Sequence, residues 1–217
     1  MGDATTVDDG ILHKPGRSAR KAKGSGHLRR AEILAAAERI FLTHGYEGAT
    51  IRKIAEEVGV SSTALYMHFR DKSEILIEIC EEAFGRLLAQ NTALSALDID
   101  PVARVRRMLD AYMRFAFENP NAYQVVYCST HPGLADGQGD SVRIMSERCY
   151  ELFVAAVRAV ADTGRLRADV EVAAQVSWAG CHGLVSLLIA RPNFAWAERE
   201  TLMALTLDAV FDGLVRS

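Results

Sequence analysis

The residue types best suited to contact another molecule follow a short turn in the first third of the chain. Val58, Gly59, Val60 and Ser61 form this turn, with glycine where a left-handed backbone conformation is needed. Apolar residues on both sides are spaced to pack two short helices against a preceding helix. This arrangement leaves five side chains facing outward: Ser62, Thr63, Tyr66, Met67 and His68. In a helix-turn-helix the second helix enters the major groove of DNA. The hydroxyl groups of Ser62, Thr63 and Tyr66 would then be suited to contact phosphates and base edges. The alternative is a helical hairpin whose outward residues are only solvated.

The distribution of charge agrees with an anionic partner for this region. The 217-residue chain has a net charge of −3, yet residues 11–73 hold 12 Lys and Arg against 6 Asp and Glu. Residues 74–217 hold 13 basic against 19 acidic residues. This split indicates a basic module joined to an acidic body, although short windows also fluctuate by chance.

The basic region begins in a segment without apolar periodicity. Residues 1–26 mix Gly, Ser, Pro and basic side chains, which predicts a flexible basic tail. Arg17, Arg20, Lys21 and Lys23 either follow the minor groove as an arm or add salt-sensitive, non-specific affinity.

From His27 onward the apolar pattern is almost entirely helical, which predicts an all-α fold of about nine helices with no convincing strand. The first four helices are expected over about 27–45, 50–59, 61–69 and 71–97, and the last two over about 170–189 and 196–215. Asp71 is expected to cap the fourth helix. Two others begin at Pro101 and Pro120, with Asp100 and Asn119 as their N-cap residues, and a third lies in the segment that precedes Gly164. We expect a helix-turn-helix domain at 27–72 and a ligand-binding and dimerisation domain at 73–217, with a loop at 129–139.

One stretch carries a dense family pattern. The segment TIRKIAEEVGVSSTALYMHFRDKSEIL, residues 50–76, resembles the DNA-binding signature of the tetracycline-repressor (TetR) family of bacterial transcription regulators. AAAERIFLTHGYEGAT, residues 35–50, is similar to that family's first helix and Gly-Tyr turn. The resemblance covers about residues 30–77, with Thr63 where many members have glycine. It implies a dimeric regulator, most simply a repressor released from a palindromic operator by a small-molecule effector.

The resemblance also implies roles for individual residues. Thr50 corresponds to a helix N-cap that touches phosphate, and Lys72 to a phosphate contact at the start of the next helix. Tyr66 and His68 correspond to backbone and groove contacts. The recognition helix carries Ser61, Ser62, Thr63, Ala64 and Met67. Ser61 as a simple cap and Met67 as a space-filling residue remain open alternatives.

The last two helices each carry two apolar stripes. In the first, one stripe is Val172, Val176, Ala179 and Gly183, and the other is Ala174, Trp178, Cys181, Val185 and Leu188. In the second, the stripes are Leu202, Leu205, Ala209 and Gly213, and Leu207, Val210, Phe211 and Leu214. Two apolar faces indicate a second buried surface, which a homodimer supplies, with Ala179, Gly180 and Gly183 allowing close approach. The alternative buries both faces within one chain.

Aromatic and methionine residues in the acidic body are candidates for a ligand pocket. They are Phe84, Leu88, Met108, Tyr112, Phe115, Tyr123, Tyr127, Met145, Phe153, Trp178 and His182. At helical spacing such residues also form an ordinary core. Gln175, Trp178, His182 and Ser186 align as a polar stripe, and WAGCHGLV, residues 178–185, resembles a Trp-His-Gly signature of one TetR subgroup. His182 either binds a ligand or is a hydrogen-bonded core or interface residue.

Other function classes find little support. No metalloprotease, nucleophile-elbow, P-loop or dinucleotide pattern is present, so we expect no enzyme, cofactor or metal site. A redox sensor needs an exposed, low-pKa cysteine, whereas the four cysteines lie in apolar surroundings. Val172 to Ala190 is uncharged, but its polar residues favour a helix buried by protein over a membrane span. A cytoplasmic protein is expected.

Overall fold

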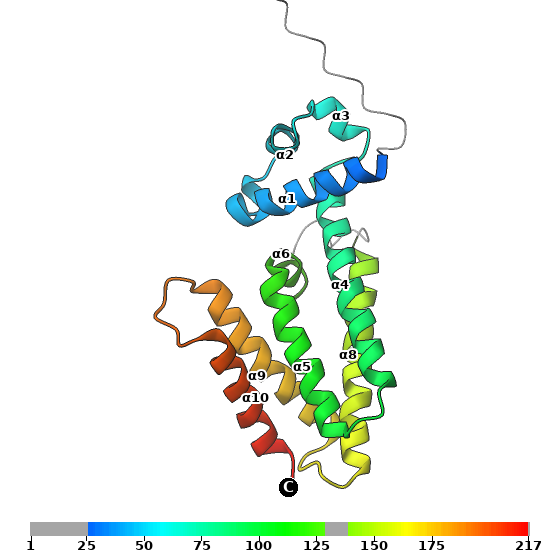
Figure 1. Ribbon diagram of the computed structural model, residues 1–217, viewed down its shortest axis with the longest axis vertical. Helices are drawn as coiled ribbons and strands as arrows, with labels where there is room; N and C mark the ends of the chain where they lie inside the picture. Colours follow the sequence, from blue (N-terminus) through cyan, green and yellow to red (C-terminus); the bar gives the residue numbers. More distant parts are fainter. Residues whose placement is uncertain (1–25, 129–138, 217) are drawn as a thin grey trace, which may run out of the picture.

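The computed structural model describes residues 26–128 and 139–216, and it is helical throughout these ranges apart from short turns and loops (Figure 1). The elements are α1 (Gly26–Gly48), α2 (Ile51–Val58), α3 (Ser62–Tyr66), α4 (Lys72–Ala96), α5 (Pro101–Glu118), α6 (Pro120–Tyr123), the π-helix η1 (Gln124–Cys128), α8 (Asp140–Asp162), α9 (Val170–Ala190) and α10 (Arg199–Leu214). Within the described ranges the one β-type pairing is an isolated antiparallel bridge, Leu166 with Val215. The all-α prediction is confirmed. The predicted tail and most of the 129–139 loop lie outside the described residues.

The first three helices pack around a small apolar centre. Ile33 and Phe41 on α1 are buried together with Ile54 on α2, Leu65 on α3 and Phe69 just after it. These contacts hold α3 on α1 and α2, and the buried residues are continuous with the core of the bundle below.

The N-terminal caps of these helices were readable from the sequence. Thr50 Oγ1 accepts a hydrogen bond from the amide of Lys53 at 3.2 Å, and Ser61 Oγ accepts one from Ala64 at 3.1 Å. Asp71 caps α4 through the amide of Glu74 at 2.9 Å. Gly59, with φ +72°, ends α2 in the left-handed conformation that the turn requires.

One helix end agrees with the sequence-based expectation and one differs from it. The first helix is broken at Gly45, with φ +67°, where it was expected to stop, and a further short helical segment continues to Gly48. The recognition helix ends at Tyr66 and not at Phe69. The amides of His68 and Phe69 still donate to the carbonyl of Leu65, so the chain turns there and returns Phe69 to the core.

The long helix α4 connects the two parts of the molecule. Its N-terminal turns lie against α1, and the rest runs down the bundle beside α8 and α5, while α9 and α10 lie on the opposite side of α5 (Figure 1). The short α6 lies at the end of the bundle that faces α1, where Asn121 Nδ2 donates to the carbonyl of Glu38 at 3.3 Å.

The two prolines expected to start helices occupy first-turn positions in α5 and α6. Asp100 caps α5 by accepting from the amide of Ala103 at 3.0 Å. Asn119 makes no side-chain cap, contrary to expectation. Its amide group instead donates to the carbonyl of Phe115 and accepts from Arg86 Nη2, both at 2.9 Å, because it is buried between α4 and α5.

Candidate DNA-binding surface and ligand cavity

The outer face of α3 presents the side chains that the sequence assigned to DNA. Leu65 is fully buried beneath the helix, whereas Tyr66 is 56 % and Met67 85 % exposed. Ser61 and Thr63 are also exposed, and the remaining candidates Ser62, Ala64 and His68 are half-buried. Tyr66 and Met67 are adjacent in the chain, at the end of the helix that carries the exposed hydroxyl group of Thr63, so this surface offers hydroxyl, aromatic and apolar groups to another molecule.

The two candidate phosphate contacts lie beside the junction between α1 and α2. Thr50 is exposed at the start of α2. Lys72 Nζ donates to the carbonyl of Tyr46 at 2.9 Å and to that of Ala49 at 3.3 Å, and it lies 4.1 Å from the centre of the Tyr46 ring. An ammonium group has three donors, so these contacts orient the charge and leave a donor for a phosphate.

A second lysine at the same junction escaped sequence reasoning. Lys53 Nζ donates to the carbonyl of Gly48 at 2.8 Å, at the end of α1. The signal that points to it is the basic pair Arg52-Lys53 on the first turn of α2. The junction therefore holds two ammonium groups beside the exposed hydroxyl group of Thr50.

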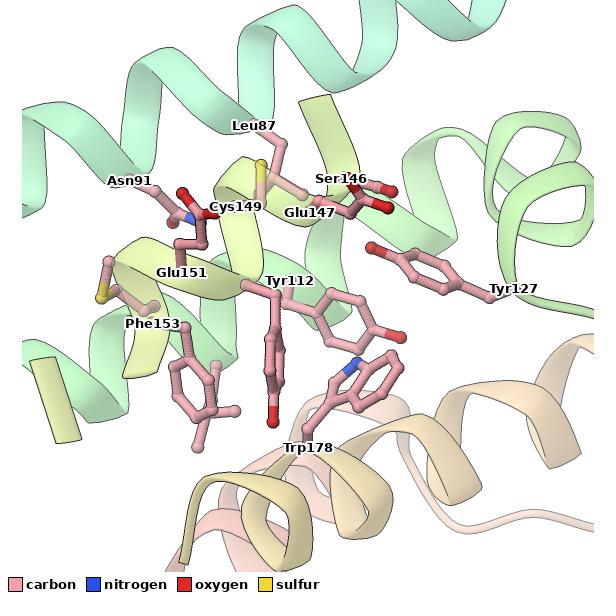
Figure 2. A pocket seen from close by; sticks show the side chains of 13 residues that line it. Leu87, Asn91, Tyr112, Tyr127, Ser146, Glu147, Cys149, Glu151, Phe153 and Trp178 are labelled. Atoms are coloured by element: carbon pink, nitrogen blue, oxygen red, sulfur yellow. The ribbon is translucent and has the colours of Figure 1, made fainter. Parts of the chain in front are cut away.

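The bundle contains a cavity of about 450 Å³ between α4, α5, η1, α8 and α9 (Figure 2). Its lining is mainly apolar and aromatic: Leu87, Asn91, Met108, Leu109, Tyr112, Tyr127, Ser146, Glu147, Cys149, Tyr150, Glu151, Phe153 and Trp178. The volume is in the range of small-molecule sites. Five of the eleven sequence candidates line it: Met108, Tyr112, Tyr127, Phe153 and Trp178.

The other six candidates lie in the surrounding core. Phe84 and Phe115 are buried against each other, with ring centres 4.8 Å apart in an edge-to-face arrangement. Leu88 and Met145 are partly buried against the core. Tyr123 and His182 join a polar network behind the cavity wall. Helical periodicity does not distinguish a residue that lines a cavity from its neighbour in the core.

His182 is the centre of this network. Its Nδ1 atom lies 2.8 Å from the hydroxyl of Tyr123 and 3.0 Å from that of Tyr112, and Tyr123 also reaches Ser186 Oγ at 2.8 Å. Burial lowers the pKa of His182, because the charged imidazolium is poorly solvated there. These hydrogen bonds fit the alternative in which His182 is a hydrogen-bonded core or interface residue. Tyr112 belongs both to the residues that line the cavity and to the network of His182, since its hydroxyl contacts His182.

Eight lining residues escaped sequence reasoning, and one of them is unusual. Asn91 is 4 % exposed, and its Oδ1 atom is buried without a hydrogen-bond partner. It follows Leu87 by four residues on the buried stripe of α4, so a polar residue at an apolar position was the available signal. Glu147 and Glu151 lie one turn apart on α8, the helix that packs directly against α4 (Figure 2).

Three cysteines have no properties of a redox sensor. Cys80, Cys149 and Cys181 are buried, and burial raises the pKa of each thiol to about 12. In the part of the chain that the structure describes, no three His, Cys, Asp or Glu residues are grouped to hold a metal ion. The helix Val170–Ala190 is long and apolar enough to span a membrane by length and composition alone.

Two family models match complementary parts of the chain. Residues 33–79 match the model for bacterial regulatory proteins of the tetR family, and residues 105–212 match the tetracyclin repressor-like C-terminal domain. The first covers α2, α3 and most of α1, and the second covers most of the bundle.

Proteins with similar sequences are transcription regulators, in agreement with these family models. The transcriptional repressor AcnR of Corynebacterium efficiens is 32 % identical over 143 residues, which are 66 % of this chain and 71 % of that protein. AcnR of Corynebacterium diphtheriae is 45 % identical, but over 28 % of this chain and 32 % of its own length. The transcriptional activator FasR of Mycolicibacterium smegmatis is 27 % identical over 57 % of this chain and 56 % of its own.

A solved structure matches over nearly its whole length. PfmR of Thermus thermophilus, a TetR family transcriptional regulator, superposes with a TM-score of 0.70 at 27 % identity, and the match covers 85 % of this chain and 99 % of that one. These relatives are DNA-binding regulators, so catalysis is not the activity expected of this chain. The helix-turn-helix and the helical bundle agree with the two family models and with these relatives. The chain therefore belongs to the TetR family of bacterial transcription regulators.

Proposed function

We propose that this protein is a dimeric repressor that binds a palindromic DNA operator through α3 and releases it when a small molecule occupies the bundle cavity. One observation carries the DNA-binding part: the outer face of α3 exposes Thr63, Tyr66 and Met67 while Leu65 anchors the helix from below. Such an element places base-contacting side chains in the major groove.

The two parts of the structure have different functions in this proposal. Residues 27–72 bind DNA, with Ser61, Ser62, Thr63, Ala64, Tyr66, Met67 and His68 at the groove and Thr50 and Lys72 at phosphates. Residues 73–217 hold the ligand and the dimer interface. Repression, rather than activation, is favoured by the two AcnR relatives, although FasR is named an activator.

The dimer interface is assigned to α9 and α10. On α9, Val172 and Val176 are about half exposed and Ala179 is exposed, whereas Ala174, Cys181 and Val185 on the opposite stripe are buried. On α10, Leu205 is 60 % exposed while Leu207 is buried. One stripe of each helix therefore covers its own bundle, and the other is left for a second copy.

Gly180 also allows a close approach within one chain. A Cβ atom at this position would lie 3.2 Å from Val210 Cγ2, so the close approach here is between α9 and α10 of one chain. The exposed apolar stripe also accounts for the membrane-like composition of α9, because a partner chain covers it. We accordingly propose a cytoplasmic protein that does not enter a membrane.

The effector part of the proposal rests on the cavity and its position. The cavity wall includes Tyr127 on η1, which directly follows α6, and α6 contacts α1 through Asn121. The wall also includes Leu87 and Asn91 on α4, which begins beside the recognition helix. A ligand that favours one arrangement of these helices changes the distance between the two copies of α3, and a lower affinity for the operator follows.

The test is selection of binding sites from random double-stranded DNA by the purified protein. The proposal predicts an enriched palindrome whose half-sites are about one helical turn, ~34–36 Å, apart. Tyr66→Ala and Thr63→Ala should lose binding to the enriched site, while Ile144→Ala, on α8 of the bundle, retains it. No enriched sequence, or equal binding by all variants, would contradict the assignment of α3.

A further inference from the structure

We infer that the cavity binds an uncharged, mainly apolar molecule with a hydrogen-bonding group such as a hydroxyl, that Asn91 holds this group, and that carboxylates are rejected. This inference rests on the proposed function for the identity of the cavity as the effector site, and it adds the chemical class of the effector.

Asn91 is the first observation. It enters the cavity wall from α4 between apolar neighbours, it is almost fully buried, and its Oδ1 atom has no partner. Figure 2 shows its side chain reaching from α4 toward one end of the cavity. A buried amide oxygen without a hydrogen bond destabilises the folded protein, and a bound molecule that donates a hydrogen bond to it removes this cost.

The chemistry of the amide restricts the partner. An asparagine side chain offers both an acceptor oxygen and an NH₂ donor, and rotation of the group exchanges them. A hydroxyl group also donates and accepts, so it fits either orientation of Asn91. A hydrocarbon leaves the amide of Asn91 without a hydrogen-bond partner in both orientations.

The absence of positive charge is the second observation. Among the described residues that line the cavity, none is lysine, arginine or histidine. The other polar groups are the hydroxyls of Ser146 and three tyrosines and the indole of Trp178, all neutral, together with Glu147 and Glu151. A carboxylate that enters this cavity would lose its water without gaining a cation, which is strongly unfavourable.

The two glutamates do not reverse this conclusion. Glu147 pairs with Arg143 at 2.7 Å, and Glu151 pairs with Arg148 at 2.7 Å, both on the exposed side of α8. Each carboxylate therefore already has a cation, and neither arginine lines the cavity. The negative charges of the glutamates repel a ligand that carries a carboxylate. Their arginine partners already neutralise them, so a cationic ligand is not required.

The aromatic and apolar lining of the cavity indicates the shape and polarity of the remainder of the ligand. Tyr112, Tyr127 and Trp178 form one side of the cavity, and Leu87, Met108 and Phe153 contribute apolar surface around them (Figure 2). The ring centres of Tyr127 and Trp178 are 5.7 Å apart, edge to face. A flat or ring-containing apolar body matches this lining, and a volume of about 450 Å³ is enough for a molecule with one ring and a short alkyl chain.

Four probes on one skeleton test the assignment: 4-pentylbenzyl alcohol, 4-pentyltoluene, 4-pentylbenzylamine and 4-pentylbenzoate. Binding to the full-length protein is measured by calorimetry and by the fluorescence of Trp178, with Trp178→Phe as the reference for the signal. The inference predicts that the alcohol binds at least about tenfold more tightly than the benzoate. Asn91→Leu should weaken the alcohol up to about tenfold and leave the hydrocarbon unchanged or tighter. Gln90→Leu, on the exposed face of α4, is the matched control and should change neither.

Each contrary result has a definite meaning. Equal or tighter binding of the benzoate overturns the charge argument, and tighter binding of the amine than of the alcohol overturns the neutral class. An alcohol affinity that is insensitive to Asn91→Leu overturns the role of Asn91, and failure of every probe to bind overturns the ligand class. Release of the selected DNA is measured separately. If the alcohol binds as predicted but leaves DNA affinity unchanged, the effector function fails while the ligand class stands.

Discussion

Arg30 on α1 binds Glu78 on α4 through two hydrogen bonds, one from Nε at 2.7 Å and one from Nη2. The same guanidinium donates to the carbonyl of His68 at 2.8 Å and lies 4.2 Å from the centre of the Phe69 ring. One side chain thus connects the first helix, the end of the recognition helix and the helix that enters the bundle. The position of α3 relative to α4 depends on this contact.

Loss of this connection should destabilise the protein. Arg30→Gln removes a two-point ion pair and the bond to His68, so we expect the free energy of unfolding to fall by about 1–2 kcal/mol, after allowance for partial exposure to solvent. Urea denaturation measures it. Arg52→Gln, which removes a fully exposed pair with Glu56, is the control and should have almost no effect. Equal effects of the two substitutions would remove the special role of Arg30.

The turn between α2 and α3 should tolerate glycine only. Gly59→Ala places a side chain at φ +72°, where no neighbour lies within 4 Å, so its cost arises from the backbone alone and is about 1 kcal/mol or more. Gly85→Ala, inside α4 and equally free of neighbours, should instead stabilise the protein by up to about 1 kcal/mol. Thermal unfolding of the two variants checks the opposite signs. A stabilising Gly59→Ala would contradict the left-handed turn.

A charge on the exposed stripe of α9 should separate the proposed dimer. Val176→Glu introduces a carboxylate where the second copy is expected to pack, and light scattering should then report the mass of one chain instead of two. Ile144→Glu is the matched control, because Ile144 is also about half exposed but lies on α8. A dimer that survives Val176→Glu, or dissociates equally with Ile144→Glu, would place the interface elsewhere.

Acid should weaken the fold through His182. Its pKa is lowered in the native state, so between that value and the ordinary one near ~6.5 the unfolded chain binds more protons. Stability therefore falls as pH decreases through and below this ordinary value. Urea denaturation between pH 7.5 and 5.5 should show a steeper loss for the wild type than for His182→Gln, in which the other histidines remain. Parallel curves would mean that His182 does not contribute.

The sequence predicted best what depends on local chemistry. Thr50, Ser61 and Asp71 cap their helices as expected, because a cap needs one short polar side chain beside its own backbone. The two stripes on α9 and α10 also separate into a buried and an exposed face. By contrast, the end of α3 was misplaced, since Phe69 is apolar in the right register but reaches the core from a turn.

The sequence predicted five of the residues that line the cavity and missed the other eight. Phe84 and Tyr127 both face the interior, and only the packing of whole helices decides that Tyr127 borders empty space while Phe84 meets Phe115. Asn91 was overlooked because one polar residue within a long apolar helix changes its periodicity little. Asn119 was misassigned as a cap because its burial depends on Arg86, which is distant in the sequence.

The most direct test of the central claim is the salt dependence and stoichiometry of binding to the selected duplex. A fluorescent duplex is titrated with the wild type and with Tyr66→Phe, Tyr66→Ala and Lys72→Gln over a range of salt concentrations. The account predicts two chains per palindrome, a steep loss of affinity with salt, and a shallower slope for Lys72→Gln because one phosphate contact is lost. Binding that is insensitive to salt, or identical for the wild type and the variants, would contradict recognition of DNA by α3.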